Sequence, residues 1–175
     1  PNKDTLGVFH AIVPGQSSKI PGVVNAGTLI YDDCNSDYGF PHLKHVVAYL
    51  QIPDNASLTD IKKIAVKSGL NGDYGDLIPK SISLVKVANG VTFIKVDLSN
   101  YNDIRAGFSI SVPYSNIGDL QTSSRPASML VVSDNFDQNV SHVQHFSSDT
   151  DSRTDAAVKA LINQENIDVN KTDYH

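Results

Sequence analysis

The stretch SISLVKVANGVTFIKVDL, residues 81–98, consists of two runs rich in valine and isoleucine on either side of Ala88-Asn89-Gly90. Branched side chains lose freedom in a helix and pack well on a pleated sheet, so each run is typical of a strand. An Asn-Gly pair between two such runs is a strong hairpin signal, because both residues tolerate a positive φ angle. Residues 81–98 therefore predict two antiparallel strands joined by a tight turn.

The same combination of short branched-aliphatic runs and turn residues recurs along the chain. Valine and isoleucine together number 32 against 12 leucines, and Glu165 is the only glutamate among 19 acidic residues. This composition favours strands and turns over helices. Further strands are expected in LGVFHAIV (6–13), AGTLIYDD (from 26), KHVVAYLQI (44–52), GFSISVPY (107–114), SMLVVSD (128–134) and, as a last edge strand, NVSHVQHF (139–146).

Two segments are expected to be helical. Ser57 and Asp60 form a variant of the capping box at the start of LTDIKKIAVKSG, residues 58–69. Thr154 can cap DAAVKALINQ, residues 155–164, whose larger apolar side chains would share one side of a helix. The second helix would either pack on the sheet or lead into a following module.

Seven or eight mostly antiparallel strands at this spacing predict a mostly β fold. We expect an antiparallel β-sandwich, immunoglobulin-like or jelly-roll-like, with one or two short helices. The alternation of strands and helices that would indicate a doubly wound parallel sheet does not occur. Residues 1–148 are expected to form the sandwich domain, and residues 149–175 a C-terminal helix or a linker to a following module.

Composition and charge exclude several classes of protein. The net charge is −5 with single, scattered basic residues, so no basic face for nucleic acid is expected. No apolar run approaches the roughly 20 residues of a membrane helix, so no membrane insertion is expected within this sequence. Cys34 is the only cysteine, which excludes an internal disulfide. Because the chain begins at Pro1 and its only methionine is Met129, we expect an excised module or a processed chain.

One loop has the composition of a calcium site. In YDDCNSDYGF (31–40), oxygen-bearing side chains alternate at Asp33, Asn35 and Asp37, as at the start of many calcium-binding loops. The EF-hand pattern then requires glycine where Tyr38 stands and a bidentate acid where Lys44 stands. The same residues are also those of a plain turn. Calcium is therefore the cofactor to test, with the turn as the alternative.

Aromatic residues lie beside this loop and beside one predicted strand. Stacking on such rings, combined with hydrogen bonds, is one way in which sandwich modules bind sugars or peptides. The alternative is that these rings cover the ends of the sandwich. The candidate ligand-binding residues are Tyr31, Tyr38, Phe40, Tyr101 and Tyr114.

Signs of catalysis are weak, and we expect no enzyme. Cys34 is flanked by acidic residues, which would raise the pKa of a nucleophilic thiol. The histidines occur in two pairs, HLKH (42–45) and HVQH (142–145), whose spacing would suit zinc on a helix but points to opposite faces of a strand. Neither a serine-nucleophile elbow nor a phosphate-binding loop is present.

Three phrases, YLQIPDNASLTDI (49–61), VTFIKVDLSNYND (91–103) and GFSISVPYSN (107–116), resemble β-sandwich modules of large wall-anchored surface adhesins of lactic acid bacteria. In those modules a strand runs into an Ile-Pro turn, followed by a V-x-x-I-x-V-D-L hairpin and a Ser-Val-Pro strand. The resemblance covers roughly residues 44–134 and assigns no functional residue. Mucin-binding repeats open on Y-x-D-x-x-G, which YDDCNSDYG (31–39) matches loosely.

The resemblance implies an extracellular, cell-wall-anchored adhesion module on the bacterial surface. Its partner would be a host glycoprotein, a glycan, mucus or an extracellular-matrix protein. Two alternatives stay open at this point. One is a carbohydrate-active domain, either a calcium-dependent lectin-like binder or a small glycan hydrolase. The other is a purely structural stalk.

Overall fold

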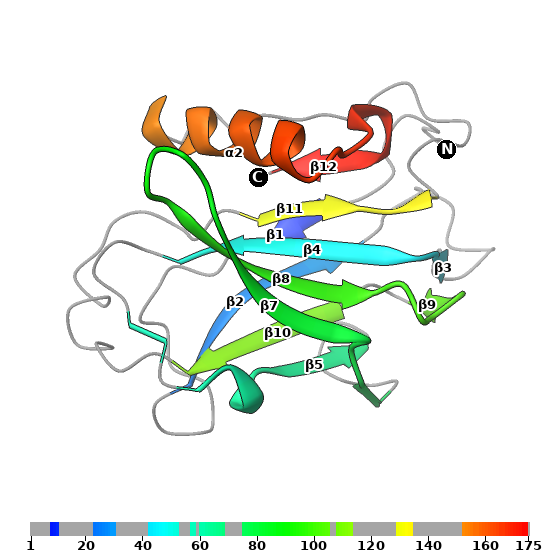
Figure 1. The fold of residues 1–175 in the computed structure, drawn as a ribbon. Coiled ribbons are helices and arrows are strands. Elements are labelled where there is room, and N and C mark those ends of the chain that lie inside the picture. The colour runs from blue at the N-terminus through cyan, green and yellow to red at the C-terminus, as the bar shows by residue number, and fades with distance from the viewer. Residues whose placement is uncertain are drawn as a thin grey trace.

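The computed structural model describes the following ranges of the chain: residues 8–10, 23–30, 42–52, 57–58, 60–68, 75–105, 108–113, 129–134 and 152–174. Their fold is mostly β, with two antiparallel sheets and one α-helix (Figure 1). The helix lies along one side of the strands, at the top of Figure 1. The antiparallel, strand-rich class predicted from the sequence is confirmed for these ranges.

The first sheet has five strands, and all of its pairings are antiparallel. In spatial order they are β1 (Val8–His10), β2 (Val23–Ile30), β10 (Phe108–Pro113), β5 (Ala65–Ser68) and β6 (Asp76–Leu77). The order differs from the chain order because β10 enters between β2 and β5. The two neighbours of β10 therefore come from segments far from it in the sequence, whereas β1–β2 and β5–β6 pair consecutive strands.

The second sheet is also antiparallel and five-stranded. In spatial order its strands are β12 (Thr172–Tyr174), β11 (Met129–Val132), β4 (Val46–Gln51), β8 (Thr92–Leu98) and β7 (Ser81–Lys86). A separate short ladder pairs β3 (His42–Leu43) with β9 (Ile104–Arg105). The helix is α2 (Ser152–Gln164), and two 3-10 turns are η2 (Ile61–Lys63) and η4 (Val169–Lys171).

The predicted hairpin of residues 81–98 is present as β7 and β8. Val87 N–H donates to Val91 O at 3.0 Å, and Gly90 N–H donates to Val87 O at 3.0 Å. Gly90 has a φ of 88°, whereas Asn89 is not in the left-handed region. The connection is therefore the three-residue hairpin loop in which a turn is followed by a left-handed glycine, rather than the two-residue Asn-Gly turn.

We expect Gly90→Ala to destabilise the protein by about 1–2 kcal/mol, since a side chain at positive φ brings Cβ against the carbonyl oxygen. A Cβ at this position would meet no other atom within 4 Å, so backbone strain alone should set the cost. Urea denaturation measures the change. Ala88→Ser in the same loop is the control and should alter the free energy of unfolding by no more than about 0.5 kcal/mol. An equal effect of the two substitutions would contradict the loop geometry.

Both faces of β4, in the middle of the second sheet, are covered, which explains its continuous apolar run. Even-numbered residues of β4 and β8 belong to a two-sheet cluster that also includes Phe108 from the first sheet. Its members, all buried, are Val46, Ala48, Leu50, Ile64, Val66, Ile94, Val96, Leu98, Ile104, Phe108, Ile110, Val112, Met129 and Val131. Strands buried on both faces are apolar throughout instead of alternating.

A second, helix-side cluster forms on the other face of the same sheet. Its buried members are Tyr49, Val87, Val91, Phe93, Leu130, Ala157, Val158 and Leu161. The last three come from α2, so the predicted apolar side of this helix is confirmed and lies against the sheet. Each residue of β4 thus faces either the two-sheet cluster or the helix-side cluster.

Polar contacts tie α2 to the sheet around Glu165, the chain's only glutamate. Its Oε1 accepts hydrogen bonds from the Tyr49 hydroxyl at 3.1 Å and from Lys95 Nζ at 2.8 Å. Burial, followed by the negative charge of Glu165, raises the pKa of Tyr49. At the other end of the helix, Asn89 Nδ2 donates to Arg153 O at 3.0 Å, which joins the hairpin tip to the first turn of α2.

The helix predicted over residues 58–69 is wrong. The capping box was predicted with Ser57 as the cap and Asp60 at the third helical position. In the structure Asp60 is itself an N-cap, its side chain accepting from Lys62 N–H at 2.9 Å, and it caps only the 3-10 turn η2. The chain then continues as β5, where buried Val66 and Ser68 alternate with exposed Ala65 and Lys67. A short helix is marginal by itself, and pairing with β10 and β6 supplies the backbone partners that decide the conformation.

The C-terminal segment differs from its prediction at both ends. The helix begins at Ser152, so Thr154 is not its cap; Thr154 is buried in the first turn, where its Oγ1 accepts from Gln51 Nε2 at 3.2 Å. Beyond the helix, β12 pairs with β11, a strand that the polar sequence Thr-Asp-Tyr did not predict. The predicted boundary at 148/149 and the predicted edge strand 139–146 lie outside the described residues.

Candidate functional site

Most of the predicted site residues lie outside the described part of the chain. This holds for the calcium loop and for four of the five candidate aromatic residues: Tyr31, Asp33, Asn35, Asp37, Tyr38, Phe40 and Tyr114. Cys34, His142 and His145 also lie outside it. Tyr101 is described, and the candidate site is therefore built from its surroundings.

Tyr101 lies in the loop after β8 and is partly buried. Its ring packs against the two-sheet cluster, and its N–H donates to Leu98 O at 3.0 Å. The hydroxyl accepts a hydrogen bond from Ile78 N–H at 2.8 Å. Tyr101 thus fixes the backbone just after β6 through its hydroxyl. The hydroxyl hydrogen can still be donated to another acceptor.

Ile78 is held by its backbone while its side chain is exposed. Besides the bond from its N–H to Tyr101, its carbonyl oxygen accepts from Asn100 Nδ2 at 3.0 Å. Ile78 is 75% exposed, the largest value among the exposed large hydrophobic residues described, ahead of Leu84 at 52%. The two supporting side chains, Asn100 and Tyr101, come from a single loop, so that loop fixes where Ile78 projects.

His45, between β3 and β4, forms the polar centre of the same end of the molecule. Its Nδ1 is 2.7 Å from Asp134 Oδ2, and its Nε2 is 2.8 Å from Asn102 Oδ1. Lys171 Nζ is 3.4 Å from the other oxygen of Asp134. The backbone of His45 has a φ of 53°, a left-handed conformation that is uncommon for a residue other than glycine and that often marks a functional position.

The electrostatics of this group follow from its hydrogen bonds. The bond to Asp134, followed by the bond to Asn102, raises the pKa of His45 above its ordinary value. The bond from His45 in turn lowers the pKa of Asp134, and Lys171 adds to that effect. Both His45 and Asp134 remain near half-exposed, at 44% and 45% of the side-chain surface.

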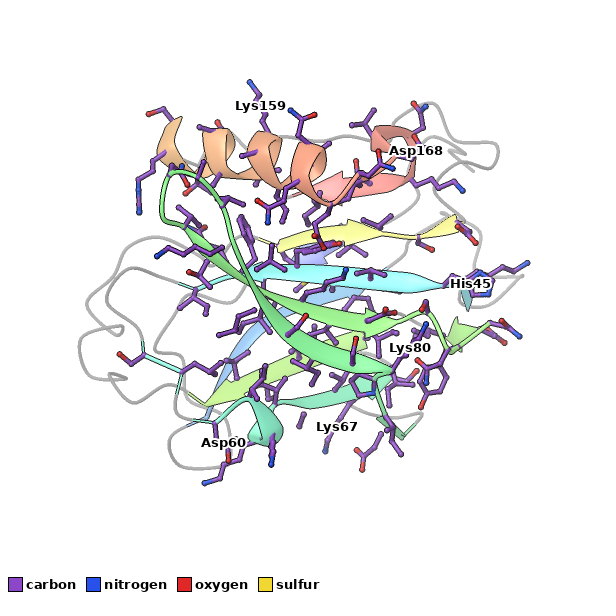
Figure 2. The ribbon with its side chains drawn as sticks, in the orientation of Figure 1. His45, Asp60, Lys67, Lys80, Lys159 and Asp168 are labelled. Carbon is purple, nitrogen blue, oxygen red and sulfur yellow. The ribbon has the colours of Figure 1, made fainter. Side chains whose placement is uncertain are left out.

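The backbone connects the two features into one surface. His45 N–H donates to Tyr101 O at 3.2 Å, so the loop that supports Ile78 also contacts the histidine. We call this the loop-end surface, defined by His45, Ile78, Asn100, Tyr101, Asn102 and Asp134. In Figure 2, His45 and Lys80, which lies two residues beyond Ile78, are labelled toward the same end of the strands.

The chemistry available at the loop-end surface is hydrogen bonding and apolar contact. An acid–histidine pair in a hydrolase has its second ring nitrogen on a nucleophile, whereas Nε2 of His45 meets the amide oxygen of Asn102. Within the described ranges, no three His, Cys, Asp or Glu side chains are grouped closely enough to hold a metal ion. Both ring nitrogens of His45 face oxygen atoms, which is a poor arrangement for the zinc ligand considered in HLKH.

The sequence indicated Tyr101 as a ligand contact and His45 only as part of the zinc-type pair HLKH, and it gave no signal for Ile78. The partners of His45 lie 89 and 57 residues away along the chain, so no local spacing signals the group. Ile78 reads as one more apolar residue beside a proline, and its exposure depends on where the loop 99–103 packs.

Comparison of the chain with protein-family models, with curated proteins and with solved structures gave no match. In the described part of the chain, none of the helices combines the length and the apolar character required to cross a membrane.

Proposed function

We propose that the chain is a non-catalytic adhesion module whose loop-end surface binds a host or extracellular-matrix protein. In this proposal the two sheets form an antiparallel β-sandwich, displayed outside the cell as part of a wall-anchored bacterial surface protein. The surface location and the adhesin class derive from the resemblance of residues 44–134. The binding role derives from the loop-end surface.

The support for a sandwich is the composition of the two-sheet cluster. Val46, Ile94 and Met129 come from one sheet, Val66 and Phe108 from the other, and all five are buried in one apolar cluster. Two sheets that share a core in this way pack face to face, with their loops gathered at the two ends. Loops on such a scaffold are where binding residues concentrate.

The observation that carries the binding proposal is the presentation of Ile78. An exposed aliphatic side chain on a mobile loop loses conformational entropy when a partner buries it. Both backbone polar groups of Ile78 are already fixed by Tyr101 and Asn100, so less entropy would be lost on binding. A fixed apolar residue within a polar rim is the arrangement of an interface anchor. Here His45, Asn102 and Asp134 supply polar groups of the rim.

The same geometry favours a protein partner over a glycan at this surface. Sugars are recognised by stacking on open aromatic rings together with free polar groups. The ring of Tyr101 packs against the core, and its hydroxyl already accepts from Ile78 N–H. An aliphatic side chain such as Ile78 instead suits an apolar pocket on a protein.

The test measures binding of the purified chain to immobilised mucin, fibronectin, collagen and laminin by biolayer interferometry. We expect Ile78→Ser to weaken binding at least about tenfold, equivalent to about 1.4 kcal/mol, because an anchor would be lost. The melting temperature should hardly change, because Ile78 is 75% exposed.

Leu84→Ser is the matched control, because it removes another exposed large aliphatic side chain, on β7, outside the loop-end surface. It should leave the affinity unchanged. An affinity that is insensitive to Ile78→Ser, or equally sensitive to both substitutions, would contradict the assignment of the surface. A glycan array with and without EDTA completes the test, since calcium-dependent glycan binding would favour the lectin-like alternative and the loop Asp33–Asp37.

A further inference from the structure

His45 joins three separate segments at the loop-end surface. Its ring contacts Asn102 in the loop after β8 and Asp134 after β11, while its own backbone precedes β4. Asp134 is held in turn by its N–H, which donates to Lys44 O at 3.1 Å, and by Lys171 Nζ from η4. The imidazole is therefore the side chain through which the loop 99–103 is attached to the end of β11.

The two ring nitrogens of His45 face two hydrogen-bond acceptors, and this determines how many protons the ring must carry. A carboxylate oxygen and an amide oxygen both accept, so hydrogen bonds to both require a hydrogen on each nitrogen, that is, the imidazolium. A neutral ring with its hydrogen on Nδ1 would keep the bond to Asp134 and present a lone pair to Asn102 Oδ1. That contact is repulsive at 2.8 Å until the Asn102 amide turns over or the loop moves away.

The charged groups around His45 favour the imidazolium on balance. Asp134 stabilises the imidazolium of His45, and the positive charge of the neighbouring residue Lys44 destabilises it. Lys171 lies near the other carboxylate oxygen of Asp134. The net effect raises the pKa of His45 above 6.5, with the Asp134 hydrogen bond as the largest cause. Stabilisation by His45 is therefore complete below pH 6.5 and is lost as the pH rises through its folded-state pKa.

Asp134 sets the lower limit of the same window. Its pKa is lowered from 3.8, so its contribution is present above pH 3.8 and is lost as the pH falls through the folded-state value. The ion pair is thus intact from mildly acidic to near-neutral pH.

We propose that His45 is a proton-operated clamp: as the imidazolium it fastens the loop 99–103 to the end of β11 through the side chain of Asn102, and loss of its proton breaks that side-chain link. Because the loop carries Tyr101 and Asn100, the clamp also controls how firmly Ile78 is held. The consequence for ligand affinity rests on the proposed function; the clamp itself does not.

The decisive measurement is an NMR titration of the imidazole nitrogens in the free protein from about pH 5 to about pH 9. The His45 signals are identified by their loss in His45→Asn, a neutral residue that also tolerates positive φ. We expect both nitrogens to be protonated at the acidic end, and a midpoint above 6.5. Asp134→Asn should lower the midpoint most and Asn102→Ala by less.

Asn100→Ala is the matched control, because it alters the same loop without touching the histidine and should leave the midpoint unchanged. A midpoint at or below 6.5, or one that neither Asp134→Asn nor Asn102→Ala moves, would overturn the clamp. As a second readout, the melting temperature of the wild type should fall relative to His45→Asn as the pH rises through the midpoint. Parallel pH profiles for the two proteins would also overturn it.

The binding assay separates this inference from the proposed function. If both hold, the affinity for the matrix protein falls as the pH rises through the His45 midpoint in the wild type, and not in His45→Asn. If His45 titrates with the expected raised midpoint but no ligand binds, the clamp is retained and the adhesion proposal is refuted. If a matrix protein binds but the midpoint of His45 is not raised, the adhesion proposal is retained and the clamp is refuted.

Discussion

Replacing Phe108 with alanine is expected to lower the free energy of unfolding by about 3–5 kcal/mol, a large part of the stability of a domain of this size. Phe108 belongs to the first sheet, is completely buried and shares the two-sheet cluster with Val46, Ile94 and Met129 of the second sheet. Removing its ring therefore costs the transfer energy of the ring and leaves a cavity in the two-sheet cluster. Chemical denaturation followed by circular dichroism measures the change.

Lys67→Ala is the matched control for Phe108→Ala. Lys67 lies on β5, which pairs with β10, but its side chain is exposed on the other face of that strand from Val66. The control should alter the free energy of unfolding by no more than about 0.5 kcal/mol. A similarly small effect of Phe108→Ala would mean that its face of the sheet is open to solvent, and the proposed sandwich would then be wrong.

Leu161→Ala is expected to destabilise the protein by about 2–5 kcal/mol. Leu161 is completely buried in the helix-side cluster, where α2 covers Tyr49, Phe93 and Leu130 of the second sheet. Alanine has a high helix propensity, so the loss would report packing against the sheet rather than a weaker helix. Thermal unfolding monitored by near-ultraviolet circular dichroism should show a lower midpoint.

Lys159→Ala on the exposed side of α2 is the control, and a change of at most about 0.5 kcal/mol is expected. Truncation after residue 148 extends the test to the whole C-terminal segment. It would uncover the helix-side cluster and remove β12 from the edge of β11, so we expect no cooperative unfolding transition. A truncated chain that still melts cooperatively at the wild-type midpoint would identify residues 149–175 as a linker.

The strands that could be predicted are those whose local signals agree with each other. Residues 81–98 combine branched side chains with a turn that requires glycine at positive φ, and the structure contains that hairpin. Residues 58–69 show the opposite case. The predicted box of Ser57 and Asp60 does not start a helix, and Asp60 caps only a 3-10 turn. β-branched Ile64 and Val66 also fit a strand, and pairing with β10 decided between the two conformations.

The candidate site could be predicted only where one residue carried its own signal. Tyr101 was identified as an aromatic residue in a loop, although the structure gives it a supporting contact to Ile78. In the sequence His45 stood out only as part of the pair HLKH, and Asn102 and Asp134 are ordinary polar residues. What groups the three is the structure, in which the ring nitrogens of His45 lie 2.7 Å from Asp134 and 2.8 Å from Asn102. The ligand and metal assignments outside the described residues stay predictions.

The sequence by itself determined the mostly β class, the positions of the main strands, the hairpin and the apolar side of the last helix. These properties depend on side-chain branching, turn chemistry and periodicity within a few residues. Only the tertiary structure decided the strand order, the conversion of residues 65–68 into β5 and the assembly of the loop-end surface. Those features depend mainly on contacts between segments about 40 to 90 residues apart, whose energies arise after the chain has packed and leave no local pattern.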